Sequence, residues 1–188
     1  AAALPKLASL KLRSSAITDD GLKHLKDLTK LRGLHLEDAD VSDEGLLSLK
    51  GLTALDDLNL LRVPIGDEGM AALADMTNMK QLILRGTYVG DEGLLHLAKM
   101  KELSKLDLSE TGVQGPGLVD AAGSKLKWPH LRNSVVADSA AEHLAKLQNL
   151  EYLNLDATLI SDDGLQKLKN LKKLKTLSAT QTSISKEA

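Results

Sequence analysis

The sequence contains no cysteine and no phenylalanine, and aromatic residues make up only 2% of its 188 residues. The absence of cysteine excludes a disulfide framework, a thiolate nucleophile and a thiolate metal site. The scarcity of aromatic rings removes the large side chains that ordinary globular cores use for bulk. Leucine must therefore supply almost all of the buried volume.

The chain also lacks a strong net charge and long apolar runs. Its formal net charge of −2 gives no electrostatic reason to expect nucleic acid or an anionic membrane as partner. No apolar stretch is long enough to span a bilayer, and no segment has the basic and apolar parts of a signal peptide. We therefore expect neither nucleic acid nor a membrane as partner. The lack of cysteine favours a cytoplasmic location without fixing the compartment.

An internal repeat dominates the sequence. Its units start near residues 7, 31, 55, 79, 103, 126, 150 and 174. The step between starts is 24 residues, except for one step of 23 before residue 126. We expect one repeat domain over residues 1–188. Because the chain begins within a unit and ends where a helix should start, we expect it to be a fragment of a longer chain, or to have an end covered by another chain.

Each unit changes its hydrophobic period halfway. In the second unit, Leu34 and Leu36 alternate with His35, which is typical of a short strand. Further along, Leu46 and Leu49 repeat at the spacing of one helical face. Between them lies a turn of Ser or Thr, two acidic residues and Gly, and we expect its hydroxyl and carboxylate groups to cap the first amides of the helix. Each unit is thus predicted to be strand, turn and helix.

Stacking such units determines the shape of the molecule. A single unit cannot bury its apolar edge alone, so neighbouring units must stack. Strands in a sheet sit ~4.8 Å apart, whereas helices with their side chains need about 10 Å. We therefore expect an α/β solenoid that is curved, with a parallel β-sheet on its concave face and helices on its convex face.

This pattern resembles the leucine-rich-repeat family over essentially the whole chain. The helical convex side is similar to the ribonuclease-inhibitor-like and cysteine-containing subclasses, and the Gly-Leu-x-x-Leu-x-x-Leu segment resembles bacterial 24-residue repeats of this type. Threonine fills the slot in which those subclasses place Asn or Cys, at Thr87, Thr111, Thr158 and Thr182. The resemblance implies the solenoid fold, and it implies a protein-interaction module by analogy alone.

The repeat is least regular between Gly112 and Pro129. The acidic turn is replaced by Gln-Gly-Pro-Gly at residues 114–117, and Pro129 stands in the place of the first strand leucine. Because proline cannot donate to a sheet ladder, we expect an irregular strand over 129–132, and we also expect a weakened helix near 118–123. The sequence leaves open whether this departure is simple drift or serves a function.

No set of residues indicates catalysis or a metal site. His24, His96 and His143 share one helical position in three separate units, and His35 and His130 are separated by four strand spacings, roughly 19 Å. The acidic pairs recur once per unit at a helix start, whereas calcium needs several oxygens around one centre. We expect no enzyme activity, no cofactor and no bound metal.

Three columns of strand side chains face the concavity, because successive strand residues point to opposite faces. Trp128 and Tyr152 fall in the same column of adjacent units. Trp, Tyr and Arg dominate binding hot spots, so this column indicates a binding site. We predict that the site comprises Trp128, His130, Arg132, Tyr152, Asn154 and Asp156. A smaller apolar spot comes from Leu61 and Ile83. The alternative for the aromatic pair is that Trp128 fills a gap left by Pro129 and Tyr152 packs on it.

The sequence therefore favours a non-enzymatic module that binds a protein or peptide on its concave face. One alternative is a structural or assembly element whose ends stack against other chains. Another is the recognition arm of a larger effector or ubiquitin-ligase-type protein, with the chemistry on a separate domain. The identity of the partner and the oligomeric state stay open.

Overall fold

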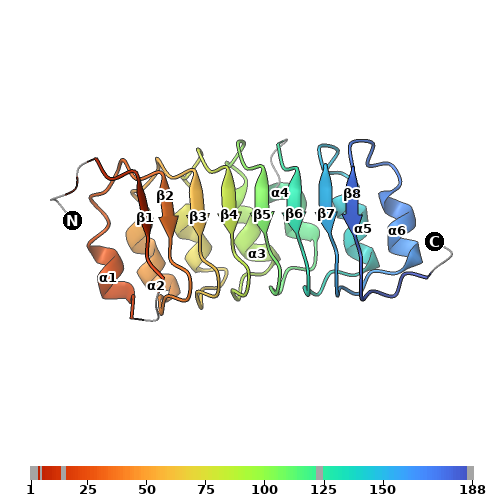
Figure 1. The fold of residues 1–188 in the computed structure, drawn as a ribbon, viewed down its shortest axis with the longest axis horizontal. Helices are drawn as coiled ribbons and strands as arrows, with labels where there is room; N and C mark the ends of the chain where they lie inside the picture. Colours follow the sequence, from red (N-terminus) through yellow and green to blue (C-terminus); the bar gives the residue numbers. More distant parts are fainter. Residues whose placement is uncertain (1–3, 5, 14–15, 122–124, 186–188) are drawn as a thin grey trace.

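The computed structural model describes residues 4, 6–13, 16–121 and 125–185. Within these residues, eight short strands form one parallel sheet in which spatial order follows chain order (Figure 1). The strands are β1 (Ser9–Lys11), β2 (Gly33–His35), β3 (Asp57–Asn59), β4 (Gln81–Ile83), β5 (Lys105–Asp107), β6 (Trp128–His130), β7 (Tyr152–Asn154) and β8 (Thr176–Ser178).

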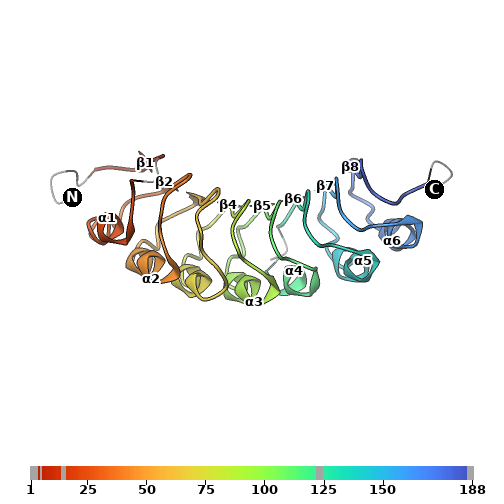
Figure 2. The same ribbon diagram turned by 90° about the horizontal axis from the view of Figure 1, so that it is seen from below.

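Helical segments connect each strand to the next. They are α1 (Asp19–Lys23), α2 (Asp43–Leu46), η1 (Leu47–Leu49), η2 (Gly69–Leu73), α3 (Asp91–Leu94), η3 (Leu95–Leu97), α4 (Pro116–Ala121), α5 (Asp138–Leu144) and α6 (Asp162–Leu168). Viewed along the sheet, the strands line the inner side of a shallow arc and the helices line the outer side (Figure 2). The expected α/β solenoid is confirmed.

Several of these helices are partly 3₁₀, a geometry compatible with leucines three residues apart. Leu46, Leu49 and Leu52 have no exposed surface. A 3₁₀-helix has 3.0 residues per turn and places residues three apart on one line, which the wider α-helix does not. The second unit begins as α2 and continues as η1, and η2 is 3₁₀ throughout, whereas α6 is an α-helix with the same leucine spacing.

Equivalent residues of consecutive units pair across the sheet. Leu34 pairs with Leu58 in the β2–β3 ladder, and both are fully buried. The register is kept across the 23-residue step, since Lys105 on β5 pairs with Trp128 on β6. The sheet therefore presents corresponding positions of neighbouring units side by side.

Pro129 interrupts the ladder between β6 and β7. These strands pair through His130 and Asn154 alone, whereas β5–β6 and β7–β8 each pair through three residues. The cause is the missing N–H of proline, and the predicted strand irregularity is confirmed. In the stretch where we predicted a weakened helix, near 118–123, α4 covers Pro116–Ala121. Residues 122–124 lie outside the described residues.

A buried hydroxyl closes the turn after the strand in successive units. Thr87 donates its hydroxyl to the carbonyl oxygen of Leu84, with an O–O distance of 2.6 Å. The same bond to the carbonyl three residues earlier is made by Thr111, Ser134, Thr158 and Thr182. The Thr or Ser hydroxyl at this position of each unit thus forms a hydrogen bond with a backbone carbonyl inside the solenoid.

An aspartate in each regular turn binds the following unit. Asp43 accepts the backbone N–H of Gly66 at 2.7 Å, and Asp67 accepts that of Gly90 at 2.6 Å. The same contact joins Asp19 to Ser42, Asp91 to Gln114, Asp138 to Ser161 and Asp162 to Ser185. We call this contact the aspartate clamp. It crosses from one unit to the next, and it lies at the start of the next unit's helix.

The clamp corrects the expectation that these side chains cap their own helices. Ser42 does so, by accepting the N–H of Gly45 at 3.2 Å, whereas Thr18 and Ser161 accept no such bond. The hydroxyl of Ser161 instead donates to Asp138, together with its N–H. These two bonds hold the pKa of Asp138 below its usual value.

The glycine two residues after each aspartate makes room for the clamp of the preceding unit. A Cβ added to Gly69 would lie 2.4 Å from Oδ1 of Asp43, well inside van der Waals contact. Gly21 occupies the same position in the first unit, but its nearest neighbour would be Cγ2 of Ile17 at 3.9 Å. The glycine of the Asp-x-Gly pattern is therefore needed because the aspartate of the preceding unit packs against it.

The joint between the fifth and sixth units replaces both clamp partners. Gly115 occupies the aspartate position, and Ala140 occupies the glycine position of the next unit. The two changes are complementary, because a Cβ on Gly115 would lie 2.5 Å from the Cβ of Ala140. A methyl group thus fills the space that a carboxylate fills elsewhere.

Gly69→Ala is expected to destabilise the protein by about 2 kcal/mol, because the added methyl group displaces the carboxylate of Asp43. The matched variant Gly21→Ala, in the same position of the first unit, is expected to be neutral or to stabilise by about 0.5–1 kcal/mol through helix propensity. Urea denaturation of both variants measures the difference. Equal effects would contradict the packing account.

Candidate functional site

An open hollow on the concave face is formed by side chains from three neighbouring strands. It has a volume of about 580 Å³ and is lined by Lys105 of β5, Trp128 and His130 of β6, and Tyr152 of β7. The parallel register brings these residues together, because Lys105 pairs with Trp128 across the sheet. Trp128, His130 and Tyr152 are half-buried and Lys105 is exposed, so the hollow offers both ring surface and a cation.

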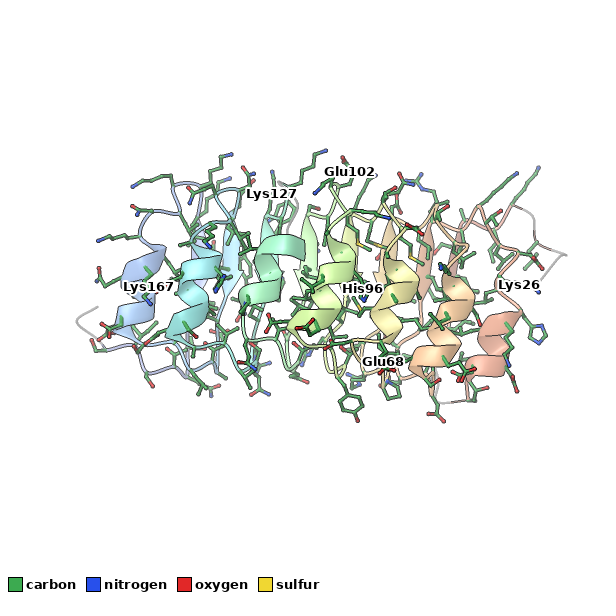
Figure 3. The ribbon with its side chains drawn as sticks, turned by 180° about the vertical axis from the view of Figure 1, so that it is seen from behind. Lys26, Glu68, His96, Glu102, Lys127 and Lys167 are labelled. Atoms are coloured by element: carbon green, nitrogen blue, oxygen red, sulfur yellow. The ribbon has the colours of Figure 1, made fainter. Side chains whose placement is uncertain are left out.

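Trp128 is flanked by a cation that is held in place from the next unit. The Nζ atom of Lys127 lies 5.5 Å from the centroid of the Trp128 ring. Lys127 is also 2.7 Å from Oε1 of Glu151, which pairs through its other oxygen with Lys175 at 2.8 Å. These two lysines lower the pKa of Glu151 to about 2. The ion-pair network thus holds Lys127 beside the Trp128 ring. Lys127 lies along a long edge of the solenoid (Figure 3).

Tyr152 contacts the histidine of the neighbouring strand. The Tyr152 and His130 rings are tilted by 38°, with their centroids 5.0 Å apart. Asn154 donates to the Tyr152 hydroxyl oxygen at 3.3 Å. Among the described residues, Tyr152 makes no ring contact with Trp128, which argues against the alternative in which Tyr152 packs on that ring.

Asn154 and Asp156 serve the end of β7 rather than the hollow. Oδ1 of Asn154 accepts the N–H of Asp156 at 2.9 Å. Asp156 in turn accepts the hydroxyl of Ser178 and the N–H of Thr180, both at 2.7 Å. Burial raises the pKa of Asp156, but these hydrogen bonds outweigh it, so the pKa lies below its usual value. Oδ1 of Asp156 is therefore engaged within the fold.

Arg132 lies outside the hollow, in the turn that follows β6. It is exposed, and no side-chain hydrogen bond or ion pair joins it to another described residue. Of the six residues predicted for the site, the structure thus brings Trp128, His130 and Tyr152 to one hollow and leaves Arg132 beside it. The remaining two support the strand.

Sequence reasoning missed a second, smaller hollow, and it missed Lys105, one of the two residues that this hollow shares with the first. This hollow, of about 90 Å³, is lined by Gln81, Leu82, Ile83, Lys105, Leu106, Asp107 and His130. It shares Lys105 and His130 with the larger hollow. The repeat register could have identified Lys105, because it occupies the column of Trp128 and Tyr152 one unit earlier.

The ionisable side chains outside the two hollows are dispersed over the solenoid. Within the described residues, no three His, Asp or Glu side chains gather closely enough to hold a metal ion. His96 lies on the helix side of the solenoid, away from the concave face (Figure 3). Of the described helices, none has the length and apolar composition needed to cross a membrane.

Comparison with known proteins agrees with this architecture. A family model described as Leucine Rich repeat matches residues 3–26 and 27–50. Internalin C2 from Listeria monocytogenes has 27% sequence identity and a TM-score of 0.77, over 98% of this chain and 76% of that chain. The resemblance to leucine-rich repeats is confirmed. No curated protein matches the chain in sequence.

Two receptor structures share the fold alone. The plant peptide hormone receptor RGFR1, solved in complex with RGF2, is 19% identical with a TM-score of 0.62, over 95% of this chain and 33% of that chain. A TDR receptor is 15% identical with a TM-score of 0.61, over 95% of this chain and 35% of that chain. This chain therefore spans about a third of either receptor.

The Glu151 network predicts how stability responds to acid. Because the pKa of Glu151 is about 2 in the folded protein, against an ordinary 4.5, its stabilisation is complete above pH 4.5 and is lost as the pH falls towards 2. We expect Glu151→Gln to flatten the decline of unfolding free energy over this range, as measured by denaturant titrations at several pH values.

The control is Glu68→Gln. Glu68 lies at the opposite long edge from Lys127 (Figure 3) and makes no ion pair with a described residue. If the free energy of unfolding declined with falling pH as steeply in Glu151→Gln as in the wild type, the assigned ion-pair network would be wrong.

Proposed function

We propose that this chain, a leucine-rich-repeat solenoid, is a non-enzymatic binding module that docks a protein or a peptide on its concave face. The observation that carries the proposal is the gathering of Trp128, His130 and Tyr152 with Lys105 around one open hollow. Two of the three aromatic residues of the chain take part. Rings with a polar tip supply large contact area at low entropic cost, which is why Trp and Tyr dominate binding hot spots.

The rigidity of the face supports the same proposal. The rings stand on short strands of a continuous sheet, and Trp128 and Tyr152 are each held by a neighbour, Lys127 and His130. A preformed surface loses less conformational freedom on binding than a mobile loop, so more of its contact energy is available for affinity. Internalin C2 and the receptor RGFR1 share the fold, and RGFR1 was solved in complex with RGF2.

A second candidate function is assembly with other chains. The turn that follows the strands exposes three large apolar side chains, Tyr88, Val135 and Leu159, with 76%, 48% and 65% of their surface accessible. Such side chains along one edge favour a contact with another subunit or domain. Analytical ultracentrifugation over a range of concentrations tests this candidate, and a constant monomer mass would count against it.

The double variant Trp128→Ala/Tyr152→Ala is expected to weaken partner binding more than thirtyfold, because hot-spot truncation typically costs about 2 kcal/mol or more. Pull-down from a lysate of the source cells identifies the partner, and isothermal titration calorimetry with the purified partner measures affinity. Circular dichroism should stay near that of the wild type.

Tyr88→Ala is the matched control, since Tyr88 is the remaining aromatic residue and its side chain is 76% exposed on the turn edge. Binding by this variant should equal that of the wild type. If Tyr88→Ala abolished binding and the double variant did not, the contact surface would be the turn edge and the concave-face proposal would be wrong.

A further inference from the structure

We propose that the concave hollow accepts a short extended segment of a partner protein, in which an acidic residue lies between two apolar or aromatic ones. This inference rests on the proposed concave-face function and specifies the chemistry of the partner. Three features of the described residues carry it: the pairing state of the cations, the apolar surfaces on either side of Lys105, and the spacing of the strands.

The cations on the strands and in the turns that follow them differ in whether they already have a partner. Arg62 contacts Asp38 at 2.6 Å, and Arg85 contacts Glu110 at 2.6 Å. Lys105, by contrast, has no carboxylate within 4.0 Å among the residues that the structure describes. A charge that the fold leaves unpaired beside a hollow can be paired by a ligand carboxylate without breaking an internal contact.

Among the described residues, the nearby carboxylates make no ion pair with Lys105. Asp107, which lines the smaller hollow, uses Oδ1 to accept the N–H of Ser109 at 3.0 Å. Asp156 accepts from Ser178 and Thr180, as described above. Arg132, exposed in the turn that follows β6, adds a second cation without a partner among the described residues. Lys105 and Arg132 are therefore two cations that a ligand carboxylate can pair without breaking an internal ion pair.

Apolar surface lies on both sides of Lys105. On the β6–β7 side are the rings of Trp128 and Tyr152 in the larger hollow. On the β4 side is Ile83, half-exposed in the smaller hollow. Since both hollows share Lys105, one ligand can place an apolar group in each and a carboxylate between them.

The dimensions match an extended peptide that runs across the strands. Ile83 on β4 and Tyr152 on β7 are separated by three strand spacings, about 14 Å. In an extended chain, side chains on one face recur every second residue, and residues four apart lie about 13–14 Å from each other. The acidic residue two positions from each apolar one then faces the region of Lys105.

Selection of random displayed peptides on the intact protein tests this inference. We expect the wild type to enrich peptides with Asp or Glu two residues from an apolar or aromatic residue. Lys105→Glu should lose this preference and enrich Lys or Arg at the same position. Lys26→Glu, an equal charge reversal at a helix-side position near the N-terminal end (Figure 3), should select the same peptides as the wild type.

A synthetic selected peptide and its Glu→Gln counterpart give the affinity. The neutral peptide is expected to bind about tenfold more weakly to the wild type, and equally weakly to Lys105→Glu. Because Trp128 is the sole tryptophan, its fluorescence reports occupancy of the hollow directly.

Two results would overturn the inference, and they are distinguishable. Peptides that require Trp128 and Tyr152 but show no acidic preference, or whose preference survives Lys105→Glu, would refute the acidic segment while leaving concave-face binding intact. A selection in which no enriched peptide depends on Trp128 and Tyr152 would refute the segment together with the proposed hot spot.

Discussion

The contact on which the solenoid depends is a carboxylate of one unit that accepts backbone N–H groups at the start of the next unit's helix. It ties units that lie 24 residues apart in sequence, as from Asp43 to Gly66 and from Asp67 to Gly90. A charged acceptor at the positive end of a helix is favourable, and short charge-assisted bonds are the strong ones. At Gly45, Gly69, Gly93 and Gly164 the carboxylate of the preceding unit occupies the space of a Cβ, and this packing fixes both the distance and the register between neighbours.

Register is what turns the repeat into a functional surface. Because the strands are aligned in register, equivalent residues of successive units lie side by side across the sheet. Lys105, Trp128 and Tyr152 therefore come from three units and line one hollow. No single unit contains this site. The concave chemistry is therefore a consequence of stacking, and a slip of one residue between units would turn the rings to the other face of the sheet.

The hollow lies where the repeat is least regular. Gly115 and Ala140 replace the clamp at the joint between the fifth and sixth units, and Pro129 leaves β6 and β7 with one paired position. Pro129 directly follows Trp128 in the chain. The glycine and alanine are complementary to each other, which favours a coordinated local change over random drift, although the proline costs ladder hydrogen bonds without an evident structural gain.

Much of the fold was predictable because its signal is periodic. The leucine spacing predicted the strands, the helical segments and the columns, and it placed Trp128 and Tyr152 in one column. The clamp was not predictable from one unit, because a capping aspartate and an aspartate that binds the next unit have the same local sequence. The mutual engagement of Asn154 and Asp156 also escaped prediction, since the sequence does not indicate which polar groups satisfy the backbone. The pairing state of Lys105 was equally beyond the sequence, because it depends on which neighbouring carboxylates the fold uses elsewhere.

Hydrogen exchange of individual turn amides tests the central claim most directly. The amides of Ser42, Gly66, Gly90, Gln114 and Ser161 donate to clamp carboxylates at 2.6–2.9 Å. Ala137 occupies the equivalent position where Gly115 replaces aspartate, and its amide has no such carboxylate acceptor among the described residues. The account predicts slow exchange at the five clamped amides and fast exchange at Ala137. Equal rates at all six positions would contradict it.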